Sequence, residues 1–168
     1  AMAMFTKQRA LLDALILAVR DAGEQILAVY RTDFAVREKH DASPVTLADE
    51  RAEALLTRAL SRLTPGVPVV AEEAVATGRV PTVGNIFWLV DPLDGTKEFI
   101  NRNGEFTVNV ALVRDHRPVL GVVGAPVLGL TYFGGVGLGA FRAEAGHAPV
   151  RIHARAAASP LVVVGSGI

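Results

Sequence analysis

No cysteine occurs in the 168-residue chain. Its absence excludes disulfides, thiolate zinc sites and a cysteine nucleophile, so the nucleophile of any reaction must be an oxygen, a nitrogen or water. A chain without cysteine also suits a reducing compartment, and we expect the protein to act in the cytoplasm.

An excess of charge of either sign is also absent, because 17 basic side chains balance 17 acidic ones. Without a broad basic surface, neither a nucleic-acid polymer nor an anionic membrane is expected as an electrostatic partner. Long apolar runs are missing too, since residues 10–19 are interrupted by Asp13 and flanked by Arg9 and Arg20. We therefore expect no transmembrane segment.

Acidic residues are almost missing from the last third of the chain. Sixteen of the seventeen precede His116, and only Glu144 follows it. Hard metal ions need carboxylate ligands, so any metal site must be built from the first two-thirds of this sequence or from residues outside it.

The residues that are present, 51% of them hydrophobic, suffice for an ordinary core. Apolar side chains recur at helical spacing over residues 8–30 and again over residues 47–63. This period predicts two amphipathic helices, the second of which begins after Thr46 and stops at Pro65 and Gly66.

Beyond the second helix the hydrophobic pattern changes to short runs rich in β-branched residues, which are typical of strands. Seven glycines between residues 121 and 139 disfavour a helix there and indicate hairpins. We predict an α+β fold in which N-terminal helices are layered on a predominantly antiparallel sheet. The expected strands are residues 67–71, 86–90, 106–113, 119–123 and 161–164.

Acids follow directly on two of these strands. Asp91 and Asp94 come after the second strand, where Pro92 and Gly95 predict a tight turn that folds both carboxylates toward one point. Crowded carboxylates repel unless a cation or a proton lies between them. Oxygen ligands without thiolate or imidazole favour Mg²⁺ or Ca²⁺. Glu72, after the other strand, would complete the cluster if the two strands are neighbours.

Simpler interpretations of these acids remain open at this point. Aspartate is common in turns and at helix N-caps, so Asp91 and Asp94 can also be turn or capping residues only. Thr46 and Asp49 have the spacing of a capping pair at the start of a helix. Thr96, one residue past the turn, offers a hydroxyl and the first free amides of a helix, where phosphate groups bind.

The segment 88–99, which contains Asp91, Asp94 and Thr96, resembles the signature of the lithium-sensitive, magnesium-dependent phosphatases of the inositol monophosphatase superfamily. Its continuation after Thr96 is more similar to the 3′(2′),5′-bisphosphate nucleotidase branch, which belongs to sulfur metabolism, than to the inositol branch. Residues 43–49 and 105–112 resemble the neighbouring segments of that family. The resemblance extends from the first helix to residue 164.

The resemblance implies a metal centre with two or three Mg²⁺ ions. Its ligands would be the carboxylates of Glu72, Asp91 and Asp94 and the backbone carbonyl of Leu93. A metal centre of this kind supplies charge neutralisation and an activated water for phosphoryl transfer.

The same resemblance implies the remaining roles in the site. Asp49 and Thr96 would orient or deprotonate the water that attacks phosphorus. Gly95, Thr96, Lys97 and Glu72 would contact the substrate. Lys97 would meet a second phosphate of the substrate, although a lysine of this kind is as often simply exposed to solvent.

The sequence departs from the family pattern in one respect. The family has a second half with a Trp-Asp motif, whereas the single tryptophan here is Trp88, which no aspartate follows. We therefore expect residues 5–155 to form an N-terminal metal-binding phosphatase subdomain. Residues 156–168 would begin a C-terminal α/β subdomain that is truncated or lies outside the sequence.

The expected function is that of a magnesium-dependent phosphomonoesterase that removes the 3′-phosphate of adenosine 3′,5′-bisphosphate or of its 5′-phosphosulfate relative. Inositol monophosphatase or fructose-1,6-bisphosphatase activity is the alternative within the class. A non-catalytic fragment that binds a metal or a protein partner is the alternative from another class. The expected partner is a small phosphorylated substrate, and a homodimer is left open.

Overall fold

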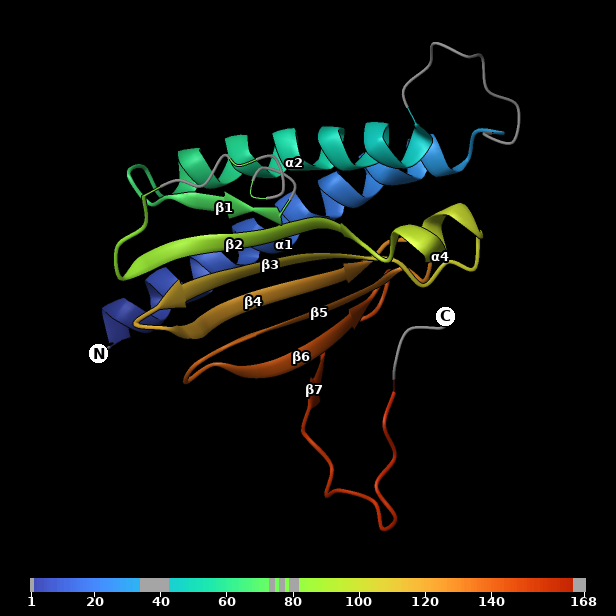
Figure 1. The fold of residues 1–168 in the computed structure, drawn as a ribbon. Coiled ribbons are helices and arrows are strands. Elements are labelled where there is room, and N and C mark those ends of the chain that lie inside the picture. The colour runs from blue at the N-terminus through green and yellow to red at the C-terminus, as the bar shows by residue number, and fades with distance from the viewer. Residues whose placement is uncertain (1, 34–42, 73–74, 76–77, 79–81, 165–168) are drawn as a thin grey trace.

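The computed structural model describes residues 2–33, 43–72, 75, 78 and 82–164. In these residues seven strands form one sheet in sequential order, with β1 parallel to β2 and every later neighbour antiparallel. The two long helices lie side by side over one face of this sheet (Figure 1). The predicted α+β class is therefore confirmed. The elements are α1 (Met2–Tyr30), α2 (Pro44–Leu63), β1 (Val69–Ala71), β2 (Ile86–Asp94), α4 (Thr96–Ile100), β3 (Thr107–Arg114), β4 (Arg117–Ala125), β5 (Leu130–Gly135), β6 (Gly139–Glu144) and β7 (Val150–Ile152).

Helix α1 packs on the middle of the sheet, over β3, β4 and β5. Its apolar stripe, which the sequence predicted, is buried at Leu12, Leu15, Val19 and Ile26. The helix comes so close to β4 that a Cβ atom on Gly124 would lie 2.8 Å from Cγ1 of Val19. A residue without a side chain is thus required where helix and strand cross.

Helix α2 covers β1 and β2. It begins at Pro44, with Ser43 at the N-cap, two residues before Thr46. Proline favours the first helical position, because its fixed φ suits a helix and its missing N–H needs no partner there. Thr46 is therefore already inside the helix, and the interpretation of Thr46 and Asp49 as a capping pair is wrong.

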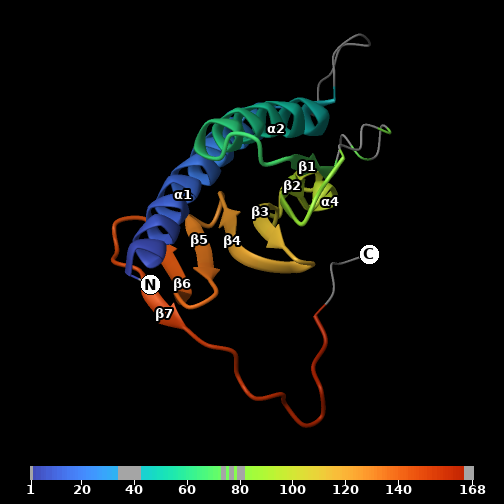
Figure 2. The same cartoon turned by 90° about the vertical axis from the view of Figure 1, so that its left-hand side faces the viewer.

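The opposite face of the sheet carries partly exposed apolar side chains. Leu89 is 48% exposed and Val123 is 38% exposed, whereas Trp88 and Val122, on the face beneath the helices, are almost completely buried. Figure 2 shows both long helices on one side of the sheet, with the chain after β7 passing on the other side. The two long helices thus cover one face of the sheet, whereas apolar side chains on the other face are partly exposed.

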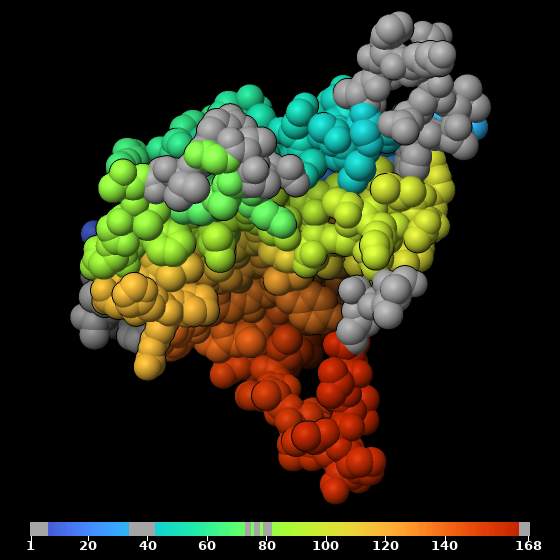
Figure 3. Space-filling model, viewed as in Figure 1, coloured from blue at the N-terminus to red at the C-terminus, as the bar shows by residue number. Residues whose placement is uncertain are grey.

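Residues 161–164 do not form the strand that the sequence predicted. Their side chains are between 75% and 91% exposed, and the segment protrudes from the body of the molecule (Figure 3). β-branched residues favour a strand only when a neighbouring strand pairs with them, and no described strand pairs with this segment. Residues 34–42, between α1 and α2, lie outside the described residues. The described helices include none that is long and apolar enough to cross a membrane.

Candidate metal centre at the ends of β1 and β2

Glu72 and Asp91 are brought together by the pairing of β1 with β2. These strands are parallel neighbours, with Val70 opposite Leu89 and Ala71 opposite Val90. Glu72 directly follows Ala71, and Asp91 directly follows Val90, so the two acids occupy the next matching positions. The sequence predicted that Glu72 joins the cluster only if these two strands are neighbours, and they are.

Asp91 and Asp94 are brought to one face by a β-bulge. Strand β2 does not end at Val90 but continues to Asp94, so the tight turn expected after Asp91 is replaced by extended chain. Asp91 pairs with Asn109 and Asp94 pairs with Thr107, so three steps along β2 correspond to two along β3. In a regular strand, residues three apart face opposite sides. The additional residue in the bulge returns Asp94 to the side of Asp91.

The burial pattern of β2 agrees with this bulge. Pro92 and Leu93 are consecutive residues and both are buried, which a regular alternating strand would not allow. The paired residues on either side, Asp91 and Asp94, are half-buried and exposed. The bulge therefore directs two apolar residues into the core and leaves both carboxylates on the accessible side.

The pKa of Asp91 is raised by its burial and by the neighbouring acids. The pKa of Asp91 is raised from 3.8 to about 7, first by burial, then by a hydrogen bond with Glu72 and by the charges of Glu72 and Asp94. A hydrogen bond from the Leu93 backbone opposes this rise in the pKa. Negative charge thus accumulates at this end of the sheet, and a bound cation would relieve the repulsion.

Asn109 is a residue of this site that the sequence did not single out. It lies on β3 directly opposite Asp91, and its Nδ2 donates a hydrogen bond of 3.1 Å to Oδ2 of Asp94. Its Oδ1 is buried and has no hydrogen-bond partner among the described residues. The alternation of β3 places Asn109 on the face away from the helices, but only the register with β2 shows that this position belongs to the acidic cluster.

The segment after the bulge begins the short helix α4. Gly95 is its N-cap, with φ of 94°, a left-handed conformation that favours glycine. A Cβ atom on Gly95 would lie 3.0 Å from Oε2 of Glu98 and 3.3 Å from Cα of Phe106. Thr96 and Lys97 follow in the first turn and are both exposed. Position 95 thus favours glycine, and the Thr96 hydroxyl and the Lys97 ammonium group follow it in the chain.

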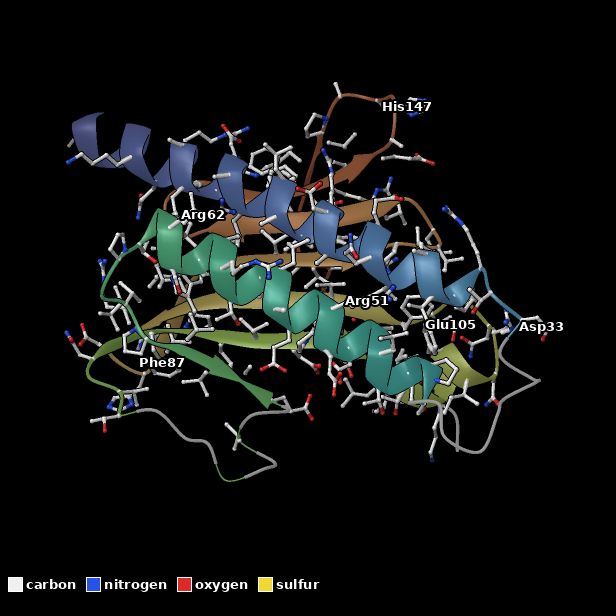
Figure 4. The ribbon with its side chains drawn as sticks, turned by 90° about the horizontal axis from the view of Figure 1, so that it is seen from above. Asp33, Arg51, Arg62, Phe87, Glu105 and His147 are labelled. Atoms are coloured by element: carbon white, nitrogen blue, oxygen red, sulfur yellow. The ribbon has the colours of Figure 1, made fainter. Side chains whose placement is uncertain are left out.

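Asp49 lies on the side of α2 that faces the sheet and is only 5% exposed. It shares this side with Ala52 and Leu56, one and two turns further along the helix. The start of α2, helix α4 and the carboxyl ends of β1 and β2 lie at the same end of the molecule (Figure 1). Seen from above, Asp33 and Glu105 mark this end, and Arg62 marks the opposite one (Figure 4).

The chemistry of these donors suits a hard cation. The candidate ligands are the carboxylates of Glu72, Asp91 and Asp94 and the carbonyl of Leu93, all of them oxygen, as Mg²⁺ prefers. The buried Oδ1 of Asn109 adds a polar atom that lacks a partner within the protein. In the part of the chain that the structure describes, no three acidic or histidine side chains are already arranged to hold an ion. The ligand types of these residues therefore suit a hard cation, although three side chains of the described residues do not yet form a coordination site.

Solved structures with the same architecture include two from bacteria. The structure of CysQ from Bacteroides thetaiotaomicron, a bacterial member of the inositol monophosphatase family, matches with a TM-score of 0.68 and 44% identity, over 79% of this chain and 48% of that one. An inositol monophosphatase from Anabaena matches with a TM-score of 0.67 and 27% identity, over 80% of this chain and 47% of that one. The fold is thus that of inositol monophosphatases and their relatives.

Sequence comparison gives the same assignment. The model of the inositol monophosphatase family matches residues 7–165, and the chain belongs to this family. The 3′(2′),5′-bisphosphate nucleotidase CysQ of Salmonella typhimurium is 45% identical over 156 residues, which are 92% of this chain and 63% of that protein. The enzyme of the same name from Escherichia coli K12 is 46% identical over 156 residues, with the same shares. The chain therefore spans somewhat less than two-thirds of these relatives.

Proposed function

We propose that the protein is a magnesium-dependent phosphomonoesterase that hydrolyses the 3′-phosphate of adenosine 3′,5′-bisphosphate or of its 5′-phosphosulfate relative. The relatives at 45% and 46% identity carry the name of this activity. The observation that carries the proposal is the placement of Glu72, Asp91 and Asp94 by two parallel strand ends and one β-bulge. Family membership alone does not identify the substrate, because one fold serves many sites.

In this proposal the carboxylates of Glu72, Asp91 and Asp94 and the carbonyl of Leu93 hold two or three Mg²⁺ ions. When bound, the ions neutralise the phosphoryl oxygens and activate the attacking water. Burial, together with the neighbouring acids Glu72 and Asp94, raises the pKa of Asp91 to about 7, which supports a site that binds positive charge.

Asp49 and Thr96 are the proposed proton-handling residues. Asp49 accepts the proton of the attacking water, and the Thr96 hydroxyl orients that water toward phosphorus. The new bond forms between the water oxygen and phosphorus, while the bond from phosphorus to the 3′-oxygen breaks and that oxygen takes up a proton. The burial of Asp49 on α2 and the exposure of Thr96 in the first turn of α4 are the observations that support these roles.

Gly95, Thr96, Lys97 and Glu72 are the proposed substrate contacts. The left-handed backbone at Gly95 leaves no Cβ atom between the chain and a phosphate group. Lys97, exposed in the first turn of α4, supplies a cation for the phosphate that is not cleaved. These contacts favour a substrate with two phosphate groups over a substrate with one.

The experiment is an assay of phosphate release by the complete protein with three substrates. We expect Mg²⁺-dependent release from adenosine 3′,5′-bisphosphate to exceed release from inositol 1-phosphate and from fructose 1,6-bisphosphate. Faster turnover of inositol 1-phosphate would instead establish the inositol monophosphatase alternative, and faster turnover of fructose 1,6-bisphosphate would establish the fructose-1,6-bisphosphatase alternative. Hydrolysis that persists in the presence of a chelator would overturn the metal mechanism.

Two broader properties complete the proposal. We place the enzyme in the cytoplasm, because a chain without cysteine gains nothing from an oxidising compartment. We also propose that two copies associate, which sedimentation of the complete protein would test by its mass in solution.

A further inference from the structure

The half-buried side chain of Asn109 combines a hydrogen bond at one end of its amide with an unpaired oxygen at the other. Its Nδ2 donates a hydrogen bond of 3.1 Å to Oδ2 of Asp94. Its Oδ1 is buried and accepts no hydrogen bond from any residue that the structure describes. Because a carboxylate only accepts hydrogen bonds, the Nδ2 side of the amide must face Asp94 and the Oδ1 side must face elsewhere.

The free energy of folding gives no reason for an asparagine at this position. A buried acceptor without a partner destabilises a protein by about 1 to 3 kcal/mol, and bulk water cannot reach this oxygen to compensate. The neighbour on the next strand in the same row is Val123, an apolar residue that fits this face of the sheet. An unpaired buried polar atom therefore requires an explanation other than fold stability, such as a role in a functional site.

The position of Asn109 in the sheet supplies that explanation. It lies opposite Asp91, and its hydrogen bond to Asp94 spans the β-bulge between these two acids. A neutral amide fixes the orientation of a carboxylate without cancelling its negative charge. A lysine or arginine at this position would fix Asp94 equally well but would compete with a cation for it.

We propose that Asn109 is a positioning residue of the metal centre, which orients the Asp94 carboxylate through Nδ2 and keeps an unpaired, buried Oδ1 as the stability cost of that role. The inference rests on the proposed function, because it requires that Glu72, Asp91 and Asp94 bind a divalent cation. Partners that orient carboxylate ligands typically change metal affinity by about 10- to 100-fold when they are removed.

The test compares metal affinity with stability in the absence of metal. Asn109→Leu removes both polar atoms and keeps a similar volume. Binding of Mg²⁺ and of Mn²⁺ to the metal-free full chain is measured by titration calorimetry, and the unfolding midpoint is measured without metal. We expect affinity to fall about 10- to 100-fold, while the metal-free midpoint stays the same or rises because an unpaired buried oxygen has been removed.

Two further variants keep the result interpretable. Asn109→Ala removes the same polar atoms without adding branched volume, in case the leucine side chain disturbs the packing. Val123→Thr is the matched control, because Val123 lies opposite Asn109 in the sheet register and makes no contact with Asp94 that the inference uses. We expect Val123→Thr to bind both ions as the wild type does.

The possible failures are distinguishable. If both Asn109 variants bind the ions as tightly as the wild type, the positioning role is overturned and the proposed function stands. If they lower the metal-free midpoint and leave affinity unchanged, Asn109 is a structural residue only. If the wild type binds neither ion, the proposed function is overturned and this inference falls with it.

Discussion

Trp88 donates its indole N–H to Oγ1 of Thr64 at 2.8 Å. The same Thr64 hydroxyl lies 3.0 Å from the carbonyl oxygen of Leu60, to which it donates. This chain of two hydrogen bonds joins β2, the strand of Asp91, to the C-terminal end of α2, the helix of Asp49. The strand with the proposed ligands Asp91 and Asp94 and the helix with the proposed base Asp49 are thus connected by two hydrogen bonds at the end of the molecule far from the candidate site.

The contact between Trp88 and Thr64 is expected to contribute a measurable coupling energy. Trp88→Phe and Thr64→Val each remove one partner, and a double-mutant cycle isolates the pair. From urea unfolding we expect a coupling of about 0.5 to 1.5 kcal/mol, the net value of a typical hydrogen bond. Additive effects of the two substitutions would show that the bond does not stabilise the fold.

Asp91 is expected to make the metal-free chain less stable as the pH rises. The pKa of Asp91 in the folded chain, about 7, lies above its ordinary value of 3.8, so between these values the folded state binds more protons than the unfolded state. The free energy of unfolding therefore falls as the pH rises through this window. Because Asp91 is partly exposed, we expect a loss of only about 1 to 2 kcal/mol.

Asp91→Asn should remove this part of the pH dependence, because an amide does not titrate. The measurement is urea unfolding of the metal-free protein at pH about 5 and about 8. Asp21→Asn, which changes an exposed acid on α1, is the control and should keep the wild-type pH dependence. A pH dependence that survives in Asp91→Asn would assign it to other groups.

Thr96→Ala is expected to slow the chemical step while leaving the metal centre intact. The hydroxyl of Thr96 orients the attacking water in the proposed mechanism but is not a metal ligand. We expect kcat to fall by about 100-fold or more, with Mg²⁺ affinity unchanged in calorimetry. Thr82→Ala, at an exposed position outside the site, is the matched control. Loss of metal binding in Thr96→Ala would contradict the assigned role.

Lys97→Ala is expected to weaken substrate binding more than catalysis. A cation that contacts the phosphate that does not react stabilises the ground state and the transition state about equally. We expect KM for adenosine 3′,5′-bisphosphate to rise about 10-fold with kcat nearly constant. A substrate without the 5′-phosphate should show no such rise, and an equal effect on both substrates would refute the contact.

Gly124→Ala is expected to destabilise the protein by about 1 to 3 kcal/mol, because the new Cβ atom overlaps with α1. The clash arises at 2.8 Å from Cγ1 of Val19. Gly121→Ala on the same strand is the control, since the nearest atom to its Cβ is the Val110 carbonyl oxygen at 3.7 Å. Equal unfolding midpoints for the two variants would show that α1 shifts to accept the methyl group.

The periodic elements of this fold are predictable from the sequence alone. The spacing of Leu12, Leu15, Val19 and Ile26 predicts α1 because one helical face must be buried. The strand at residues 161–164 was predicted wrongly from the same kind of evidence. Its β-branched residues favour an extended backbone, but a strand also needs a neighbouring strand to pair with, and the local sequence does not show whether one is present.

The acidic site was predictable in its composition but not in its geometry. Pro92 and Gly95 indicated a turn, yet the chain between them stays extended because β3 pairs with both Asp91 and Asp94. That pairing joins Asp91 to Asn109 and Asp94 to Thr107, residues 18 and 13 positions apart, which no local pattern reveals. Asn109 was missed for the same reason, because its relation to Asp94 exists only through the register.

The shortness of β1 has a consequence for how this region opens in solution. The strand has three residues, lies at the edge of the sheet and is paired on one side only, with β2. Its amide protons should therefore exchange with solvent through local opening, at a lower free energy than those of β3, which has neighbours on both sides. Because Glu72 directly follows β1, a cation held by Glu72 would slow exchange at this edge before it slowed exchange anywhere else in the sheet.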